Sequence, residues 1–433
     1  MIWDGKTETM ARPQLRELQL RRLKRAVNAA YEHSELYRRK FDEVGLKPRH
    51  IRTLEDARLI PFTTKEDLRR GYPFGMFQVP MAQVVRLHAS SGTTGQPTVV
   101  GYTRRDLQTW SDCVARLACM AGVTHEDIAQ IAFGYGMFTG AFGLHDGLTK
   151  VGCTVIPASS GNTERQLLFL KDFGTTVLVS TPSYALYLAE AAERAGLDPK
   201  RDLKLRVGLF GGEGHSDKLR AELESKLGLL CTENYGLSEI VGPGVSGECT
   251  ERAGLHINED HFLPEIIDPA SGQPLPPGQP GELVLTAMTK QALPILRYRT
   301  RDLTALDETP CRCGRTLVRM AKVQGRNDDM LIIRGVNVFP TQVEEVLHGV
   351  KEVGPHYEII VRREDALDEM EVLVELLDAS LLERYGELER LTERIRKQLR
   401  TALLVDARVR LVEPQTLKRF EGKAKRVTDL RKG

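Results

Sequence analysis

Short apolar runs alternate with helical segments in the middle of the chain. Runs at 154–156, 177–180 and 207–210 have the composition of buried strands, and helical patterns at 184–194 and 217–227 lie between and after them. Strands that alternate with helices form crossover units around a mainly parallel sheet. The sequence therefore predicts an α/β fold with a largely parallel central sheet.

The chain has 433 residues, a length that predicts more than one domain. Residues 13–45 follow a helical period, and glycine and proline at 61–80 predict an irregular stretch. A proline- and glycine-rich turn at 274–281 precedes a strand at 282–286. We expect a large N-terminal domain over 1–326, whose first 85 residues are mostly helical.

The last hundred residues have a different pattern, typical of a small α+β domain. Strands are expected at 357–361, 370–376 and 409–412, a long charged helix at 381–404, and a basic tail after them. We expect this small domain to span 327–433 and to be mobile.

Composition excludes several classes of protein. The 61 Lys and Arg residues almost balance the 59 Asp and Glu residues, so the chain lacks the basic footprint of a nucleic-acid-binding protein. No apolar run is long enough to cross a bilayer, and the N-terminus lacks a secretory pattern. Seven cysteines, an odd number, argue against a disulfide framework. We expect a cytoplasmic protein without a membrane partner.

The segment 90–98 carries the first sign of chemistry. Its residues are mostly glycines and small hydroxyl side chains: Ser90, Ser91, Gly92, Thr93, Thr94 and Gly95. Glycines let the backbone approach a phosphate closely, and amides and hydroxyls donate to phosphate oxygens. The Gly-Lys-Ser/Thr of a Walker A loop is missing. Taken by itself, the segment is equally typical of a polar surface loop.

Further motifs follow in a fixed order at 211–213, 235–239, 298–302, 325–329 and 422–423. Together with 90–98 they resemble the adenylate-forming superfamily, which includes acyl-CoA synthetases, peptide-synthetase adenylation domains and luciferases. The segments 97–103, 334–340 and 421–427 are most similar to phenylacetate–CoA ligases. Gln96 departs from that branch, which usually carries lysine there.

The resemblance implies a reaction and its cofactors. An aryl carboxylic acid such as phenylacetate attacks ATP and gives an acyl-adenylate and pyrophosphate. The acyl group is then transferred to coenzyme A, and AMP is released. Mg²⁺ is the implied metal, and Glu239 its ligand, because a hard cation prefers oxygen ligands. Lys423, Glu239 and Thr94 are the implied catalytic residues, and Asp328 is the implied hinge of a rotating small domain.

The resemblance also assigns the nucleotide site. Residues 90–95 hold the phosphates, Glu213, Asn234 and Tyr235 line the adenine pocket, and Asp302 accepts from the ribose hydroxyls. Arg326 contacts the ribose or a phosphate. Gly212 and Gly236 complete the nucleotide-binding set. A solvated basic tail is the competing interpretation of the region around Lys423, and a surface carboxylate that of Glu239.

An aromatic, glycine-rich run at 133–140 matches the family region that touches the acid. Tyr135 and Phe138, with Gly211 and Gly236, are the predicted walls, since aromatic side chains with glycine gaps suit a flat ring. Ordinary core packing is the competing interpretation. No Asp or Lys in this run could pair an amino group, which disfavours an amino-acid substrate.

Three cysteines and a histidine could hold a structural Zn²⁺. Cys311 and Cys313 form a close pair, and Cys249 with His256 could complete a Cys₃His site. The competing interpretation is three reduced thiols and an ordinary histidine.

Rival functions remain open. A ligase that loads a carrier-protein thiol shares the first half-reaction, and a non-catalytic nucleotide or acyl-adenylate sensor could use the same scaffold. A simple ATPase is disfavoured, because this chain lacks the lysine of a Walker A loop. The sequence does not identify the acid, and relatives suggest a homodimer.

Overall fold

The alternating segment forms one side of a nine-stranded mixed sheet in a computed structural model that describes residues 1–90, 97–327, 330–334, 336–364, 367–420 and 424–432. Five strands of this sheet are parallel, and four antiparallel strands extend it. In spatial order they are β13 (Leu306–Asp307), β14 (Arg319–Met320), β9 (Leu255–Ile257), β8 (Gly242–Glu248), β7 (Leu230–Leu237), β6 (Val207–Gly211), β5 (Val177–Ser180), β3 (Ile128–Ile131) and β4 (Thr154–Ile156). The predicted α/β class is confirmed.

Helices of the large domain pack beside this sheet. They are α5 (Arg104–Met120), α6 (Thr139–Val151), α7 (Thr163–Asp172), α8 (Pro182–Arg194), α9 (Pro199–Asp202) and α10 (Asp217–Leu227). Hydroxyl side chains define where several begin: Thr103, Thr181 and Ser216 each accept from a backbone amide three residues on. Leu178 and Phe210 of the sheet are buried in one core with apolar residues of α7, α8 and α10.

The N-terminal region corrects two expectations. The predicted helix at 13–45 is two helices, α2 (Arg12–His33) and α3 (Glu35–Glu43), because Ser34 between them is extended. The stretch expected to be irregular contains α4 (Lys65–Arg70), which a capping box of Thr64 and Asp67 stabilises. Short elements complete the region: α1 (Gly5–Glu8), η1 (Pro48–His50), η2 (Glu55–Leu59) and η3 (Met81–Gln83).

Two further sheets complete the large domain. Strands β1 (Arg86–Ala89) and β2 (Val99–Tyr102) form an antiparallel hairpin. The second sheet is antiparallel and consists of β10 (Phe262–Ile267), β11 (Gly281–Ala287), β12 (Ile295–Thr304) and β15 (Gly325–Arg326).

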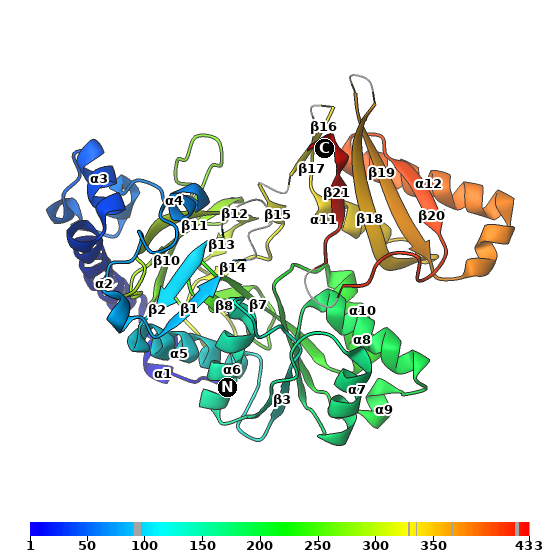
Figure 1. Cartoon of the computed structure of the whole chain (residues 1–433), viewed down its shortest axis with the longest axis horizontal. Coiled ribbons are helices and arrows are strands. Elements are labelled where there is room, and N and C mark those ends of the chain that lie inside the picture. The colour runs from blue at the N-terminus through cyan, green and yellow to red at the C-terminus, as the bar shows by residue number, and fades with distance from the viewer. Residues whose placement is uncertain (91–96, 328–329, 335, 365–366, 421–423, 433) are drawn as a thin grey trace.

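The C-terminal part has its own hydrophobic core, separate from those of the large domain, and lies beside α8 and α10 (Figure 1). Its main sheet has the order β20 (Arg408–Val412), β19 (Leu367–Leu376), β18 (Val353–Glu364) and β21 (Val427–Asp429). The remaining elements are β16 (Leu331–Ile333), β17 (Val336–Val338), α11 (Pro340–Leu347), η4 (Ala379–Glu383), α12 (Tyr385–Leu403) and η5 (Leu430–Lys432).

Two details of the small domain differ from the sequence-based expectation. The charged helix begins at Tyr385 and not at 381, because Asp378 caps a short 3₁₀ turn first. The basic tail contains a strand, β21, paired with β18. The boundary between 326 and 327 stays a prediction; residues 328 and 329 lie outside the described residues.

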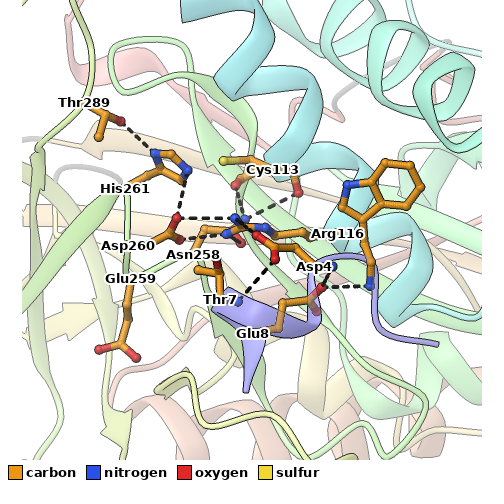
Figure 2. A network of polar contacts seen from close by, with 12 residues as sticks. Asp4, Thr7, Glu8, Cys113, Arg116, Asn258, Glu259, Asp260, His261 and Thr289 are labelled. Carbon is orange, nitrogen blue, oxygen red and sulfur yellow. Dashed lines mark hydrogen bonds and ion pairs between the residues drawn. The ribbon is translucent and has the colours of Figure 1, made fainter. Parts of the chain in front are cut away.

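A buried ion-pair network ties the N-terminal segment to the large domain (Figure 2). Arg116, 4% exposed, contacts Asp260 at 2.7 Å and Asp4 at 3.0 Å. His261 lies 3.0 Å from Asp260, and its other ring nitrogen contacts the Thr289 hydroxyl at 2.8 Å. The network therefore connects the start of the chain to the loop after β11.

Among the residues that the structure describes, no helix is both long enough and apolar enough to cross a membrane.

Candidate active site

The carboxyl ends of β6 and β7 bring two of the sequence motifs together. Gly211 at the end of β6 pairs with Asn234 in β7, and a Cβ at 211 would lie 2.7 Å from the Asn234 backbone oxygen. Gly212 has φ of +83°, a left-handed conformation that favours glycine. These glycines let the chain turn sharply above the strand ends, where ligands of open α/β sheets bind.

Tyr235, Asp302 and Arg326 lie in contact. The Tyr235 hydroxyl donates to Asp302 Oδ2 at 2.5 Å, and Arg326 Nη1 lies 3.5 Å from Asp302 Oδ1. Burial and the Asp302 charge raise the pKa of Tyr235 well above its ordinary value, so the phenol keeps its proton and donates. Three of the predicted nucleotide residues, from two different sheets, therefore meet at one place.

Glu239 follows β7 and is 8% exposed. Burial and the nearby Glu239 carboxylate raise the pKa of Tyr298 well above its ordinary value. Lys290 Nζ donates to the Glu239 backbone oxygen at 3.0 Å and lies 5.0 Å from the Tyr102 ring centroid. Burial lowers the pKa of Lys290 to about 8.

The contact of Lys290 with Glu239 was not predicted from the sequence. Lys290 belongs to none of the motifs, although its neighbour Thr289 contacts His261 of the buried network. No local signal in the sequence distinguishes this lysine from the many others.

The glycine-rich segment connects β1 to β2. Ser90 N donates to the Thr98 oxygen at 3.0 Å, and Thr98 N donates to Ser90 Oγ at 3.1 Å, which closes the base of the loop. Ala89 N donates to the Met137 oxygen at 2.9 Å, so the hairpin contacts the aromatic run. The predicted residues Ser91, Gly92, Thr93, Thr94 and Gly95 lie outside the described residues, as does Gln96.

The aromatic run lies at the start of α6. Tyr135 is half-buried, and its hydroxyl is 3.1 Å from His145 Nδ1. Phe138 immediately precedes α6 and is 48% exposed. Gly236 packs so closely that a Cβ would lie 1.8 Å from the Gly242 oxygen. Thr139 at the start of α6 contacts Ser238 between hydroxyl oxygens at 2.9 Å, so the run and the 235–239 motif adjoin.

Glu213 bridges the two domains. Its Oε1 accepts from Ser183 N at 2.8 Å, and its Oε2 accepts from Ala424 N at 2.9 Å. The family resemblance implies a place in the adenine pocket for this carboxylate, and these two contacts were not predicted. Lys423 and Asp328, the predicted catalytic lysine and hinge, lie outside the described residues.

The predicted zinc ligands lie together in the structure. The ligand atoms of Cys249, His256, Cys311 and Cys313 are all within 4.8 Å of one another. Cys249 Sγ lies 3.8 Å from Cys311 Sγ, and Cys313 Sγ lies 3.4 Å from His256 Nε2. The other ring nitrogen, Nδ1, lies 3.3 Å from the Leu317 oxygen, which favours the tautomer that leaves Nε2 free as a ligand.

Electrostatics at this cluster suit a metal. Burial lowers the pKa of His256 to about 4, so the imidazole is neutral at pH 7. Burial raises the pKa of Cys249 to about 12, so this thiol keeps its proton unless a metal ion displaces it, whereas hydrogen bonds with Arg315 lower the pKa of Cys313 against the effect of burial. The donor set therefore fits tetrahedral Zn²⁺.

Comparison with known proteins gives the class of this site and fold. Residues 55–288 match the family model described as AMP-binding enzyme, and residues 335–431 match the model of the AMP-binding enzyme C-terminal domain. The large and small domains thus correspond to the two parts of an AMP-binding enzyme.

Individual relatives narrow the class. The chain is 49% identical to a phenylacetate-coenzyme A ligase from Thermus thermophilus, with all of both chains covered. It is 50% identical to one from Pseudomonas putida, over 98% of this chain and 96% of the relative. The chain belongs to the phenylacetate-coenzyme A ligase family of AMP-binding enzymes.

A solved structure resembles the whole arrangement. The structure of 2-hydroxyisobutyryl-CoA ligase in the postadenylation state matches with a TM-score of 0.93 and 28% identity, covering all of this chain and 93% of the other. The same ligase in its thioesterification state, with the same coverage, matches with a TM-score of only 0.73 and 29% identity.

Proposed function

We propose that this chain joins an aryl carboxylic acid, phenylacetate or a related arylacetate, to coenzyme A. The reaction uses ATP, passes through an acyl-adenylate and releases AMP and pyrophosphate. The observation that carries this proposal is the 49% identity to a phenylacetate-coenzyme A ligase over the full length of both chains. The meeting of Tyr235, Asp302 and Arg326 at the strand ends supports it.

The chain's own residues suit the parts of this reaction. Asp302 can accept from the ribose hydroxyls, and Tyr235 and Asn234 can line the base. Glu239 would ligate Mg²⁺, the ion that screens the charge between the acid and ATP. Residues 90–95 would hold the pyrophosphate, and Lys423 would contact the attacking carboxylate and the α-phosphate.

The domain arrangement supports an alternating enzyme. The whole chain fits the postadenylation state of 2-hydroxyisobutyryl-CoA ligase with a TM-score of 0.93, and its thioesterification state with 0.73. We infer that the small domain here adopts the adenylation pose and rotates about Asp328 before coenzyme A reacts.

A panel of acids tests the substrate class. We expect exchange of labelled pyrophosphate into ATP with phenylacetate at least about tenfold faster than with phenylalanine, because the ammonium of an amino acid would be desolvated without a partner. Coenzyme A, added alone or replaced by a carrier protein, then identifies the acceptor. Exchange that favours phenylalanine would contradict the aryl-acid proposal, and transfer to the carrier alone would identify the rival ligase.

We further propose a structural Zn²⁺ at Cys249, His256, Cys311 and Cys313. Four protein ligands leave no open position, so the ion would stabilise the fold and not react. It would hold the 311–313 turn near the N-terminal segment, where Arg315 Nε donates to Glu8 Oε2 at 2.6 Å and Thr316 N donates to the Glu8 oxygen at 3.0 Å.

Elemental analysis tests the zinc site. We expect about one zinc per chain in protein purified without chelator, and a loss of most of it in Cys313→Ser. Cys153→Ser, which changes a buried thiol outside the cluster, should keep the metal. Equal zinc in both variants, or almost none in the unaltered protein, would contradict the site. The homodimer and the cytoplasmic location stay predictions.

A further inference from the structure

The Glu213 carboxylate connects two elements that belong to different domains. On one side it accepts from Ser183 N in the first turn of α8, and on the other from Ala424 N. Both bonds are charge-assisted and of normal length. A half-buried carboxylate with an amide on each oxygen holds its two donors in a defined relative position.

Ala424 moves with the small domain. Directly after it, the Arg426 oxygen accepts from Ile359 N at 2.7 Å, and β21 pairs with β18. Arg426 also lies over the Tyr357 ring, 4.5 Å from the centroid. Five residues before Ala424 in the chain, Arg419 contacts the buried Glu375 of the small domain at 2.7 and 2.8 Å.

Ala424 is thus held to the small domain by the residues after it, and Glu213 reaches it from the large one. Ala424 is the next residue after the proposed catalytic Lys423 in the chain. The proposed rotation of the small domain would carry Ala424 away from Glu213 and break this bond.

We propose that Glu213 is a positioning residue that latches the small domain, through the Ala424 amide, in the adenylation pose and releases it for thioester formation. This role rests on the proposed function. It differs from a place in the adenine pocket, since an adenine contact would act on ATP binding. The latch acts on the rate of adenylation with ATP already bound.

Other contacts also cross the domain interface but do not involve Ala424. Thr341 Oγ1 donates to the Gln324 oxygen at 2.6 Å, and Ser216 Oγ lies 2.6 Å from His348 Nδ1. Thr341→Val removes one cross-domain hydrogen bond in which Ala424 takes no part. It is therefore a matched control for a change at Glu213.

Glu213→Ala tests the latch, because it removes both acceptor oxygens, whereas glutamine would keep one oxygen able to accept from Ala424 N. We expect the maximal rate of phenylacetate-dependent pyrophosphate exchange to fall about tenfold to a hundredfold. The KM for ATP should stay within about threefold, as should transfer to coenzyme A from synthetic phenylacetyl-AMP. Thr341→Val should change neither half-reaction by more than about threefold.

A second variant and an activity-independent readout make the test decisive. Ala424→Pro removes the donor, so combining it with Glu213→Ala should cost little more than either change alone. Without any substrate, Glu213→Ala should speed hydrogen exchange at the Ala424 amide relative to wild type and Thr341→Val.

The outcomes separate the latch from its alternatives. Equal losses in both half-reactions, or unchanged exchange at the Ala424 amide, would overturn the latch. A loss confined to the KM for ATP would assign Glu213 to the adenine pocket instead. Absence of phenylacetate-dependent pyrophosphate exchange in wild type would contradict the proposed function. Hydrogen exchange at the Ala424 amide would still show whether Glu213 makes this contact.

Discussion

Lys423→Ala should slow acyl-adenylate formation by about 100- to 1,000-fold, the range seen when a donor to transition-state charge is removed. The carboxylate of the acid and the α-phosphate both carry negative charge, and the proposed role of Lys423 is to contact both. Thioester formation from synthetic phenylacetyl-AMP should stay within about threefold of wild type, because the proposed rotation of the small domain would remove this lysine from the adenylate. Rapid-quench measurement of each half-reaction gives both rates.

Lys425→Ala is the matched control for this variant. Lys425 is exposed and lies two residues further along the same basic segment. If only the charge of the tail matters, the two variants should slow adenylation equally. We expect instead that Lys425→Ala changes the rate of adenylation less than about threefold. Equal losses in both half-reactions for Lys423→Ala would contradict a role confined to adenylation.

Asp260→Ala should lower the free energy of unfolding of the large domain by about 3 to 5 kcal/mol. The change leaves Arg116 buried with Asp4, at 3.0 Å, as its remaining ion-pair partner in the network, and it also removes a partner of Arg22. Uncompensated buried charge accounts for most of the expected cost. Urea unfolding followed by tryptophan emission measures it, since Trp3 and Trp110 both lie in the large domain.

The pH dependence of this effect has a definite sign. Burial opposes ionisation, but His261 and Arg116 together hold the pKa of Asp260 below its ordinary value. A carboxyl with a lowered pKa stabilises the fold above its unfolded pKa of about 4 and loses that contribution as pH falls further. The deficit of Asp260→Ala should therefore be constant near neutrality and shrink in acid.

An exposed ion pair supplies the control for stability. Glu17 and Arg21 lie 2.8 Å apart on α2 and are both more than half exposed, so Glu17→Ala should cost less than about 1 kcal/mol. If Asp260→Ala lowered the free energy of unfolding by no more than Glu17→Ala does, the buried network would contribute little to stability.

The predicted strands were recovered where local pattern decides structure. Runs such as 177–180 and 207–210 are apolar throughout because both faces of a parallel strand are buried. The break at Ser34 has no glycine or proline to mark it, and β21 forms only because β18 is available as a partner. Such features depend on tertiary contacts and not on local periodicity.

The candidate site likewise contains residues that the motifs predict and contacts that they do not. The motifs predicted that Tyr235, Asp302 and Arg326 share one region, because each belongs to a short signature that resembles one of the family's. The contact of Lys290 with Glu239 joins residues 51 positions apart, and the contact of Glu213 with Ala424 joins residues 211 positions apart. No spacing rule relates residues so distant in the chain, so only the structure could reveal these contacts.

Product analysis tests the central claim most directly. Purified protein is incubated with phenylacetate, ATP, Mg²⁺ and coenzyme A, and the nucleotides and acyl products are separated by chromatography with mass detection. The proposal predicts phenylacetyl-CoA and AMP in equal amounts, with phenylacetyl-AMP accumulating on the enzyme when coenzyme A is left out. Formation of ADP in place of AMP, or no acid-dependent nucleotide turnover at all, would contradict it.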